Sequence, residues 1–129
     1  MIIRKGTKAD LQATFDLIME LAVYEKAPEE VENSVARMEE DGFGENPIFD
    51  FFVCQREGKV VGTAIYYFRY STWKGKSLYL EDLVVSESER GNGAGKLLFD
   101  AIVIEAKATN SKVVTWQVLD WNEPAIRHQ

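Results

Sequence analysis

The chain has 129 residues, of which 46% are hydrophobic and 28% charged, and its formal net charge is −6 at pH 7. This size and composition predict one folded domain over residues 1–129 and exclude a disordered chain or a second module. An acidic surface repels nucleic acid and anionic membranes, so we expect neither as a partner and expect a small cationic substrate instead.

The chain opens with a predicted strand and a helix. Residues 2–4, with two isoleucines, are typical of a short strand, and the pattern Thr7-x-x-Asp10 is typical of a helix start with an acid in the first turn. Apolar residues then recur at helical spacing between residues 11 and 25. We therefore expect an amphipathic helix over this segment.

A second helix and a hairpin are predicted next. Either Asn33 or Ser34 caps a helix that runs to residue 41, where nearby glycines end it. The β-branched and aromatic segments 51–55 and 60–69 are separated by a short polar turn. This arrangement predicts a β-hairpin.

The second half of the chain continues the alternation. Residues 78–85 predict a third long strand, residues 89–96 a glycine-rich turn, and apolar residues between 97 and 108 a helix. A further strand is predicted over residues 113–118, and Pro124 is suited to the first turn of a last helix. This element order predicts a mixed α/β sheet flanked by helices.

The turn Glu89-Arg90-Gly91-Asn92-Gly93-Ala94-Gly95-Lys96 is the strongest functional signal. Its three glycines permit positive φ, so that successive N–H groups can point at one anion. The first turn of the following helix adds unpaired N–H donors and the positive end of a helix dipole. The sequence therefore predicts a phosphate-binding turn.

Glycine spacing separates the known kinds of phosphate turn. A P-loop needs G-x-x-x-x-G-K-[ST], but Gly95-Lys96 is followed by Leu97 and has no glycine five residues earlier. A dinucleotide fold needs G-x-G-x-x-G and an acid at the end of the next strand, which residues 113–118 lack. The remaining pattern, R-x-x-G-x-G, resembles the pyrophosphate loop of the GNAT acyltransferases.

Blocks outside the turn make the resemblance specific. They are Glu20-Leu21-Ala22-x-Tyr24-Glu25, Asp41-Gly42-Phe43-Gly44-Glu45-Asn46-Pro47, Tyr79-Leu80-Glu81-Asp82-Leu83-Val84-Val85 and Trp121-Asn122-Glu123-Pro124-Ala125-Ile126. In this order they are similar to the diamine N-acetyltransferases, the spermidine/spermine and thialysine acetyltransferases. The resemblance implies a GNAT fold in which parallel strands, here ending at Val85 and Val118, splay apart to admit acetyl-CoA.

The same resemblance implies site residues. It makes Glu81 the acid that binds the amine and accepts its proton. It also implies substrate contacts at Tyr24, Glu25, Glu81, Thr115, Trp116 and Gln117, and cofactor contacts at Leu83, Val84, Val85, Arg90, Gly91, Asn92, Gly93, Ala94, Gly95, Lys96, Asn122 and Ala125. The alternatives without a functional role are a solvated strand carboxylate for Glu81 and core packing for Leu83, Val84 and Val85.

Acetyl transfer to an amine needs a base, because an alkylammonium has a pKa of about 10 and is almost wholly protonated at neutral pH. Glu81 would take that proton through a water molecule. By strand alternation its neighbour Asp82 is expected on the opposite face. The substrate stays open between a polyamine and thialysine, with Ser71-Thr72-Trp73 lacking an acid that polyamine-specific relatives carry before this tryptophan.

The chain departs from the family after the asparagine-glutamate-proline block. Similar enzymes continue with a tyrosine that protonates the leaving thiolate and with two more strands, whereas the tyrosine position falls here at Gln129. Two alternatives follow: an impaired acyl-CoA-binding module, and an α/β domain that binds no cofactor. Without the last strands, residues 113–118 would form an exposed sheet edge, which predicts a homodimer or other self-association.

The remaining residues give no further chemistry. The N-terminus lacks the apolar stretch of a signal peptide, which leads us to expect a cytoplasmic protein. Cys54, the one cysteine, lies in an apolar segment and is expected to be core packing. His128, the one histidine, has no clear cluster of ligands, so no metal site is expected.

Overall fold

The computed structural model describes residues 1–115 and the backbone of residues 125–127. Its strands form one sheet with the order β1-β2-β3-β4-β5, and β6 pairs with β4. The strands are β1 Ile2–Lys5, β2 Asp50–Arg56, β3 Lys59–Ser71, β4 Gly75–Val85, β5 Lys112–Val114 and β6 Ala125–Arg127. All neighbours are antiparallel except β4 and β5, which are parallel. The predicted mixed α/β sheet is confirmed.

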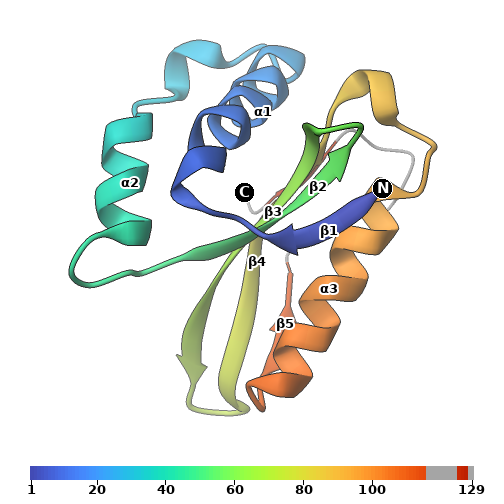
Figure 1. Cartoon of the computed structure of the whole chain (residues 1–129). Coiled ribbons are helices and arrows are strands. Elements are labelled where there is room, and N and C mark those ends of the chain that lie inside the picture. The colour runs from blue at the N-terminus through green and yellow to red at the C-terminus, as the bar shows by residue number, and fades with distance from the viewer. Residues whose placement is uncertain (116–124, 128–129) are drawn as a thin grey trace.

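In the part of the chain that the structure describes, three α-helices cover the two faces of this sheet. They are α1 Leu11–Tyr24, α2 Val35–Phe43 and α3 Ala94–Ala108. Figure 1 shows α1 and α2 on one side of the sheet and α3 on the other. Short 3₁₀ turns precede or join them: η1 Lys8–Asp10, η2 Pro28–Glu30 and η3 Glu87–Glu89.

Strand alternation divides the core between the two faces. Phe51 and Val53 of β2 belong to the cluster under α1 and α2, whereas Phe52 and Cys54 belong to the cluster under α3. Cys54 is 0% exposed, and burial raises the pKa of its thiol. Its predicted role as core packing is confirmed.

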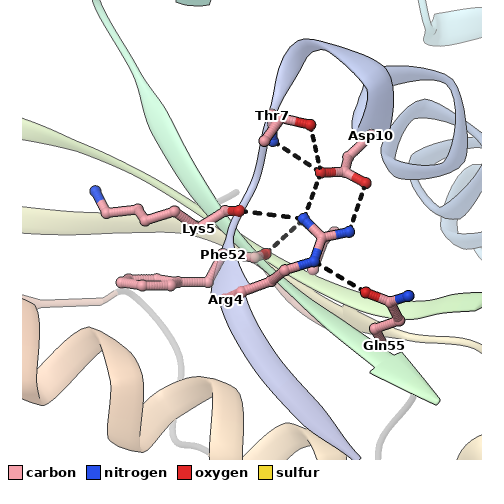
Figure 2. A network of polar contacts seen from close by, with 7 residues as sticks. Arg4, Lys5, Thr7, Asp10, Phe52 and Gln55 are labelled. Carbon is pink, nitrogen blue, oxygen red and sulfur yellow. Dashed lines mark hydrogen bonds and ion pairs between the residues drawn. The ribbon is translucent and has the colours of Figure 1, made fainter. Parts of the chain in front are cut away.

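The helix boundaries follow local capping. The Ser34 hydroxyl accepts a hydrogen bond from the Arg37 N–H at 3.1 Å, so Ser34 rather than Asn33 is the N-cap of α2. Just before α1, the Asp10 carboxylate accepts a hydrogen bond from the Thr7 N–H at 2.8 Å. It also accepts one from the guanidinium of Arg4 in β1 (Figure 2). The predicted helix start at Thr7 and Asp10 is therefore confirmed.

The predictions for the C-terminal part need two corrections. A strand is predicted over residues 113–118, but β5 ends at Val114 and does not include Thr115. Residues 116–118 lie outside the described part of the chain. The helix predicted from Pro124 is wrong, because residues 125–127 form a strand. β5 pairs with β4 at residues 77–79 and leaves residues 82–84 of β4 open for pairing with β6. A strand here pairs its backbone groups with β4, whereas a short helix would leave most of its terminal N–H and C=O groups without partners.

Candidate active site

The turn between β4 and α3 contains two glycines in the left-handed region. Gly91 and Gly93 both have φ of +85°, which residues with a Cβ rarely adopt. Gly93 is also the N-cap of α3, and no side chain caps this helix. The N–H groups of the first turn therefore have no intrahelical acceptor and lie at the positive end of the helix dipole. The turn has the geometry of an anion site.

Arg90 supplies a charged donor to this turn. One of its Nη atoms lies 3.1 Å from the Glu87 carboxylate, while its buried Nε has no hydrogen-bond partner among the residues that the structure describes. A buried donor left unsatisfied costs about 1–3 kcal/mol. A phosphate oxygen would satisfy it, so the groups present fit the diphosphate of coenzyme A.

A hollow of about 200 Å³ lies over the turn. It is lined by Val85, Glu89, Arg90, Gly91, Gly93, Ala94, Gly95 and Lys96. The Lys96 ammonium is exposed and 3.2 Å from Asp100, and the Asn92 side chain donates to the Glu89 carboxylate at 3.4 Å. All the predicted diphosphate residues except Asn92 thus line one hollow, and their ligand stays a prediction.

A β-bulge places Glu81. On β3, Ile65 pairs with Asp82 and the next residue, Tyr66, pairs with Leu80, so Glu81 is an extra residue in β4. A bulge of this kind shifts the side-chain alternation by one position. The buried residues of the α3 face show this shift, since they are Leu78, Leu80, Leu83 and Val85.

Because of the bulge, Glu81 and Asp82 lie on the same face. Both line one cavity, which corrects the expectation that Asp82 points to the opposite side of the strand. Each of the two carboxylates is half-buried. Two carboxylates that are adjacent in the sequence therefore face the same cavity.

This cavity, of about 600 Å³, lies between β3, β4 and the helices α1 and α2. Its walls are mostly apolar and aromatic, with carboxylates at a few points. The lining residues are Phe15, Ile18, Asn33, Met38, Asp41, Ile48, Phe49, Ile65, Tyr67, Phe68, Glu81 and Asp82. Apolar walls with few polar groups are typical of a small-molecule site, and carboxylates select a cation.

Tyr79 lies two residues before Glu81 on β4 and is 0% exposed. Burial, and to a lesser degree the Glu81 carboxylate, raises the pKa of the Tyr79 hydroxyl. Tyr79 is therefore neutral at physiological pH. Its ring centroid lies 5.2 Å from that of Tyr67, a residue of the cavity wall, with the two ring planes tilted by 33°.

The backbone of β4 after the bulge is the segment predicted to pair with the pantetheine amides. On one side Leu83 and Val84 pair with β3, and on the other side they pair with Ile126 and Ala125 of β6. The structure thus places Ala125, a predicted cofactor contact, beside Val84. It also shows that β6 uses the same edge of β4.

A third hollow, of about 350 Å³, lies between the end of α1 and the end of β4. Tyr24 is 57% exposed and lines it together with Val84, Val85 and Arg90, so the structure brings Tyr24 to the predicted cofactor residues. Glu25 follows as the exposed C-cap of α1. Neither residue is among those that line the cavity with Glu81.

The other predicted substrate contacts lie mostly outside the described residues. Thr115 directly follows β5 and is half-buried. Trp116, Gln117 and Asn122 lie outside the part of the chain that the structure describes, as does Gln129. Their roles stay predictions.

Sequence reasoning gave no role in the site to two carboxylates that line the cavity. Asp41 was recognised only as part of a matched block, and Asp82 was assigned to the wrong face. The signal for Asp82 was present, since the apolar pairs Leu78/Leu80 and Leu83/Val85 are out of phase by one residue.

Over residues 1–115, no group of three or more His, Cys, Asp or Glu side chains is arranged to hold a metal ion. No helix in this part of the chain has the length and apolar character needed to cross a bilayer.

Comparison with known proteins identifies the family. Residues 11–128 match the model of the acetyltransferase (GNAT) family. The thialysine N-epsilon-acetyltransferase of Bos taurus is 37% identical over 134 residues, which cover 98% of this chain and 79% of that protein. The spermidine/spermine N(1)-acetyltransferase-like protein 1 of Homo sapiens is 34% identical, covering 98% of this chain and 19% of that protein.

Solved structures share the fold. The BH1408 protein from Bacillus halodurans, as a tetramutant, superposes with a TM-score of 0.73 at 27% identity, covering 95% of this chain and 85% of that one. A predicted acetyltransferase from Clostridium acetobutylicum, solved with acetyl-CoA, has a TM-score of 0.71 at 18% identity, covering 88% of this chain and 78% of that one.

Proposed function

The chain belongs to the acetyltransferase (GNAT) family and is an amine N-acetyltransferase, and from this premise we propose its donor and its substrate. The donor is acetyl-CoA, and the acetyl group passes directly to a primary amine of a small polyamine or of a lysine-like compound such as thialysine. The observation that carries the proposal is the bulge that turns Glu81 into the cavity beside Asp82.

The cofactor residues form a continuous path along β4. Arg90 and the N–H groups of the glycine turn hold the diphosphate, and the backbone of Leu83 to Val85 holds the pantetheine amides. When bound, acetyl-CoA supplies the acetyl group as a thioester. Glu81 lies three residues before Val84, about 10 Å along extended chain, and the turn that holds the diphosphate follows the end of β4 at Val85.

The cavity residues provide the amine site. Glu81 accepts a proton at a carboxylate oxygen, because the attacking nitrogen must be neutral while an alkylammonium has a pKa of about 10. Asp82 and Asp41 supply further negative charge for the ammonium groups of the substrate. The rings of Phe15 and Tyr67 pack against the methylene groups of its aliphatic chain. A cation with an aliphatic chain suits this combination.

The charge of the protein supports a cationic substrate. Residues 25–45 hold eight carboxylates and two basic side chains, a net charge equal to that of the whole chain. This segment includes α2, whose Met38 and Asp41 line the cavity. A cation is attracted to the cavity mouth by this field.

Removing the proposed base tests the mechanism. Glu81→Gln should lower kcat by about 10²–10⁴, the usual contribution of a general base, while the dissociation constant of coenzyme A stays nearly unchanged. Release of free thiol from acetyl-CoA with spermidine or thialysine measures turnover, and calorimetry measures binding. An unchanged turnover rate in Glu81→Gln removes Glu81 from the mechanism.

A second candidate is an acyl-CoA-binding module with little turnover. Gln129 favours it, because this position in similar enzymes holds a tyrosine that protonates the leaving thiolate. Both candidates require coenzyme A binding, and they differ in thiol release. Binding without release over a panel of amines would support the module, and no binding at all would reject both.

A further inference from the structure

Glu20 connects helix α1 to the segment that carries the predicted diphosphate site. Its side chain extends from the exposed surface of α1, and Oε1 accepts a hydrogen bond from the Glu87 N–H at 2.8 Å. The contact joins residues 67 positions apart in the chain.

Glu87 is the first residue of η3, and Arg90 directly follows this turn. The Glu87 carboxylate in turn lies 3.1 Å from the Arg90 guanidinium. Glu20, Glu87 and Arg90 line the same hollow at the end of β4. A continuous chain of polar contacts therefore runs from α1 through Glu87 to Arg90.

Among the described residues, two further contacts tie this segment to other elements. The Ser86 N–H donates to the Val61 carbonyl at 2.8 Å, and Arg56 lies 2.8 Å from the Glu89 carboxylate. Val61 belongs to β3 and Arg56 to β2. Of these three anchors, only Glu20 fixes the segment to α1.

We propose that Glu20 is a positioning residue for Arg90 and for the glycine turn, and this rests on the proposed function for its ligand. By fixing the Glu87 N–H to α1, it limits the positions that Arg90 can take relative to β4. Glu20 does not hold the diphosphate itself. Its negative charge lies in the same hollow as Arg90, where it opposes binding of an anion.

Positioning of Arg90 by Glu20 raises the affinity for coenzyme A, whereas the negative charge of Glu20 lowers it. Two substitutions of Glu20 separate these effects. In Glu20→Gln the amide oxygen still accepts the Glu87 N–H and the negative charge is gone, so the affinity for coenzyme A should stay equal or rise. In Glu20→Ala both the acceptor and the charge are lost. If positioning dominates, affinity falls about fivefold, the factor for one ordinary hydrogen bond.

Amide hydrogen exchange of the free protein is the first test. Glu20→Ala should speed exchange at the Glu87 amide and over residues 88–93 by about fivefold, and Glu20→Gln should exchange like the parent. Glu39→Ala is a matched control, because Glu39 is an exposed glutamate inside α2. Unchanged exchange in Glu20→Ala, or equally fast exchange in Glu20→Gln, overturns the inference.

Calorimetry with coenzyme A on the full chain is the second test. The expected order of affinity is Glu20→Gln at least equal to the parent, the parent equal to Glu39→Ala, and Glu20→Ala weakest. Equal affinities in all four proteins reject the positioning role. A parent protein that fails to bind coenzyme A rejects the proposed function, while the exchange experiment still decides the role of Glu20.

Discussion

Asp10 ties the first strand to the first helix. Its carboxylate accepts hydrogen bonds from the two Nη atoms of Arg4 at 2.7 and 3.0 Å and from the Thr7 N–H at 2.8 Å (Figure 2). The Arg4 hydrogen bond, aided by those from Thr7, lowers the pKa of Asp10 from 3.8 to about 2, although burial of the carboxylate acts in the opposite direction. The ionised form is therefore favoured in the folded protein.

A lowered pKa makes stability depend on pH. Above the unfolded pKa of 3.8, Asp10 contributes stability that is lost as the pH falls towards 2, where the folded carboxyl also binds a proton. The full contribution is about 2 kcal/mol, from 1.36 kcal/mol per unit of pKa. Asp10→Asn should lower the free energy of unfolding by about this amount at pH 7, and the difference from the parent should shrink near pH 2–3.

Urea unfolding at several pH values measures this effect. Asp100→Asn is a suitable comparison, because the Lys96–Asp100 pair on α3 is exposed and contributes at most about 0.5 kcal/mol. If Asp10→Asn and Asp100→Asn lose the same stability at pH 7, the network around Asp10 does not stabilise the fold as argued.

At the scale of the elements, β4 shows what the sequence could predict. The hairpin of β2 and β3, the caps of α1 and α2, and the glycine turn all depend on neighbours in sequence, and local patterns predicted them. The bulge at Glu81 depends on pairing with β3, and simple alternation placed Asp82 on the wrong face. Local patterns thus predicted the elements that carry the candidate site, but not the side-chain geometry at the bulge.

The strand β6 was missed for a related reason. Three residues carry too little pattern to specify a strand, and their pairing is decided by the edge that β4 offers far away in the sequence. The described edge at β5 is also short, three residues with Lys112 among them, and short charged edges resist association. Self-association therefore stays a prediction, for sedimentation to test.

The position of β6 leads to a prediction about cofactor affinity. If the pantetheine pairs with Leu83 and Val84, β6 must leave that edge first, and its release costs binding free energy. Ile126→Pro removes one N–H and disfavours an extended partner strand, so coenzyme A should bind about two- to tenfold more tightly. Calorimetry on the full chain measures the dissociation constant.

Ile126→Val is the matched substitution, because it keeps the N–H and a β-branched side chain. It should bind coenzyme A like the parent. Equal affinities for Ile126→Pro and Ile126→Val would mean that β6 does not compete with the cofactor.

At the scale of the whole molecule, charge is unevenly distributed along the chain. Residues 25–45 carry the net charge of −6, while the rest of the chain is balanced. This segment includes η2 and α2, which lies on the face of the sheet opposite to α3 (Figure 1). The field of the protein is therefore strongest on the side of the Glu81 cavity, and salt screens it over about 10 Å at 0.1 M.

This field predicts how salt affects catalysis. For a diamine, kcat/KM should fall severalfold between low salt and about 0.2 M, because steering of a doubly charged substrate is screened, and kcat should change little. A monoamine of equal length should respond less. Steady-state thiol release with both amines measures this difference. In Glu29→Gln/Glu30→Gln, which removes two exposed charges of the segment, the salt response should weaken. Glu57→Gln/Asp100→Asn removes the same charge outside the segment and should keep the response, so equal behaviour of the two double variants would show that steering comes from total charge alone.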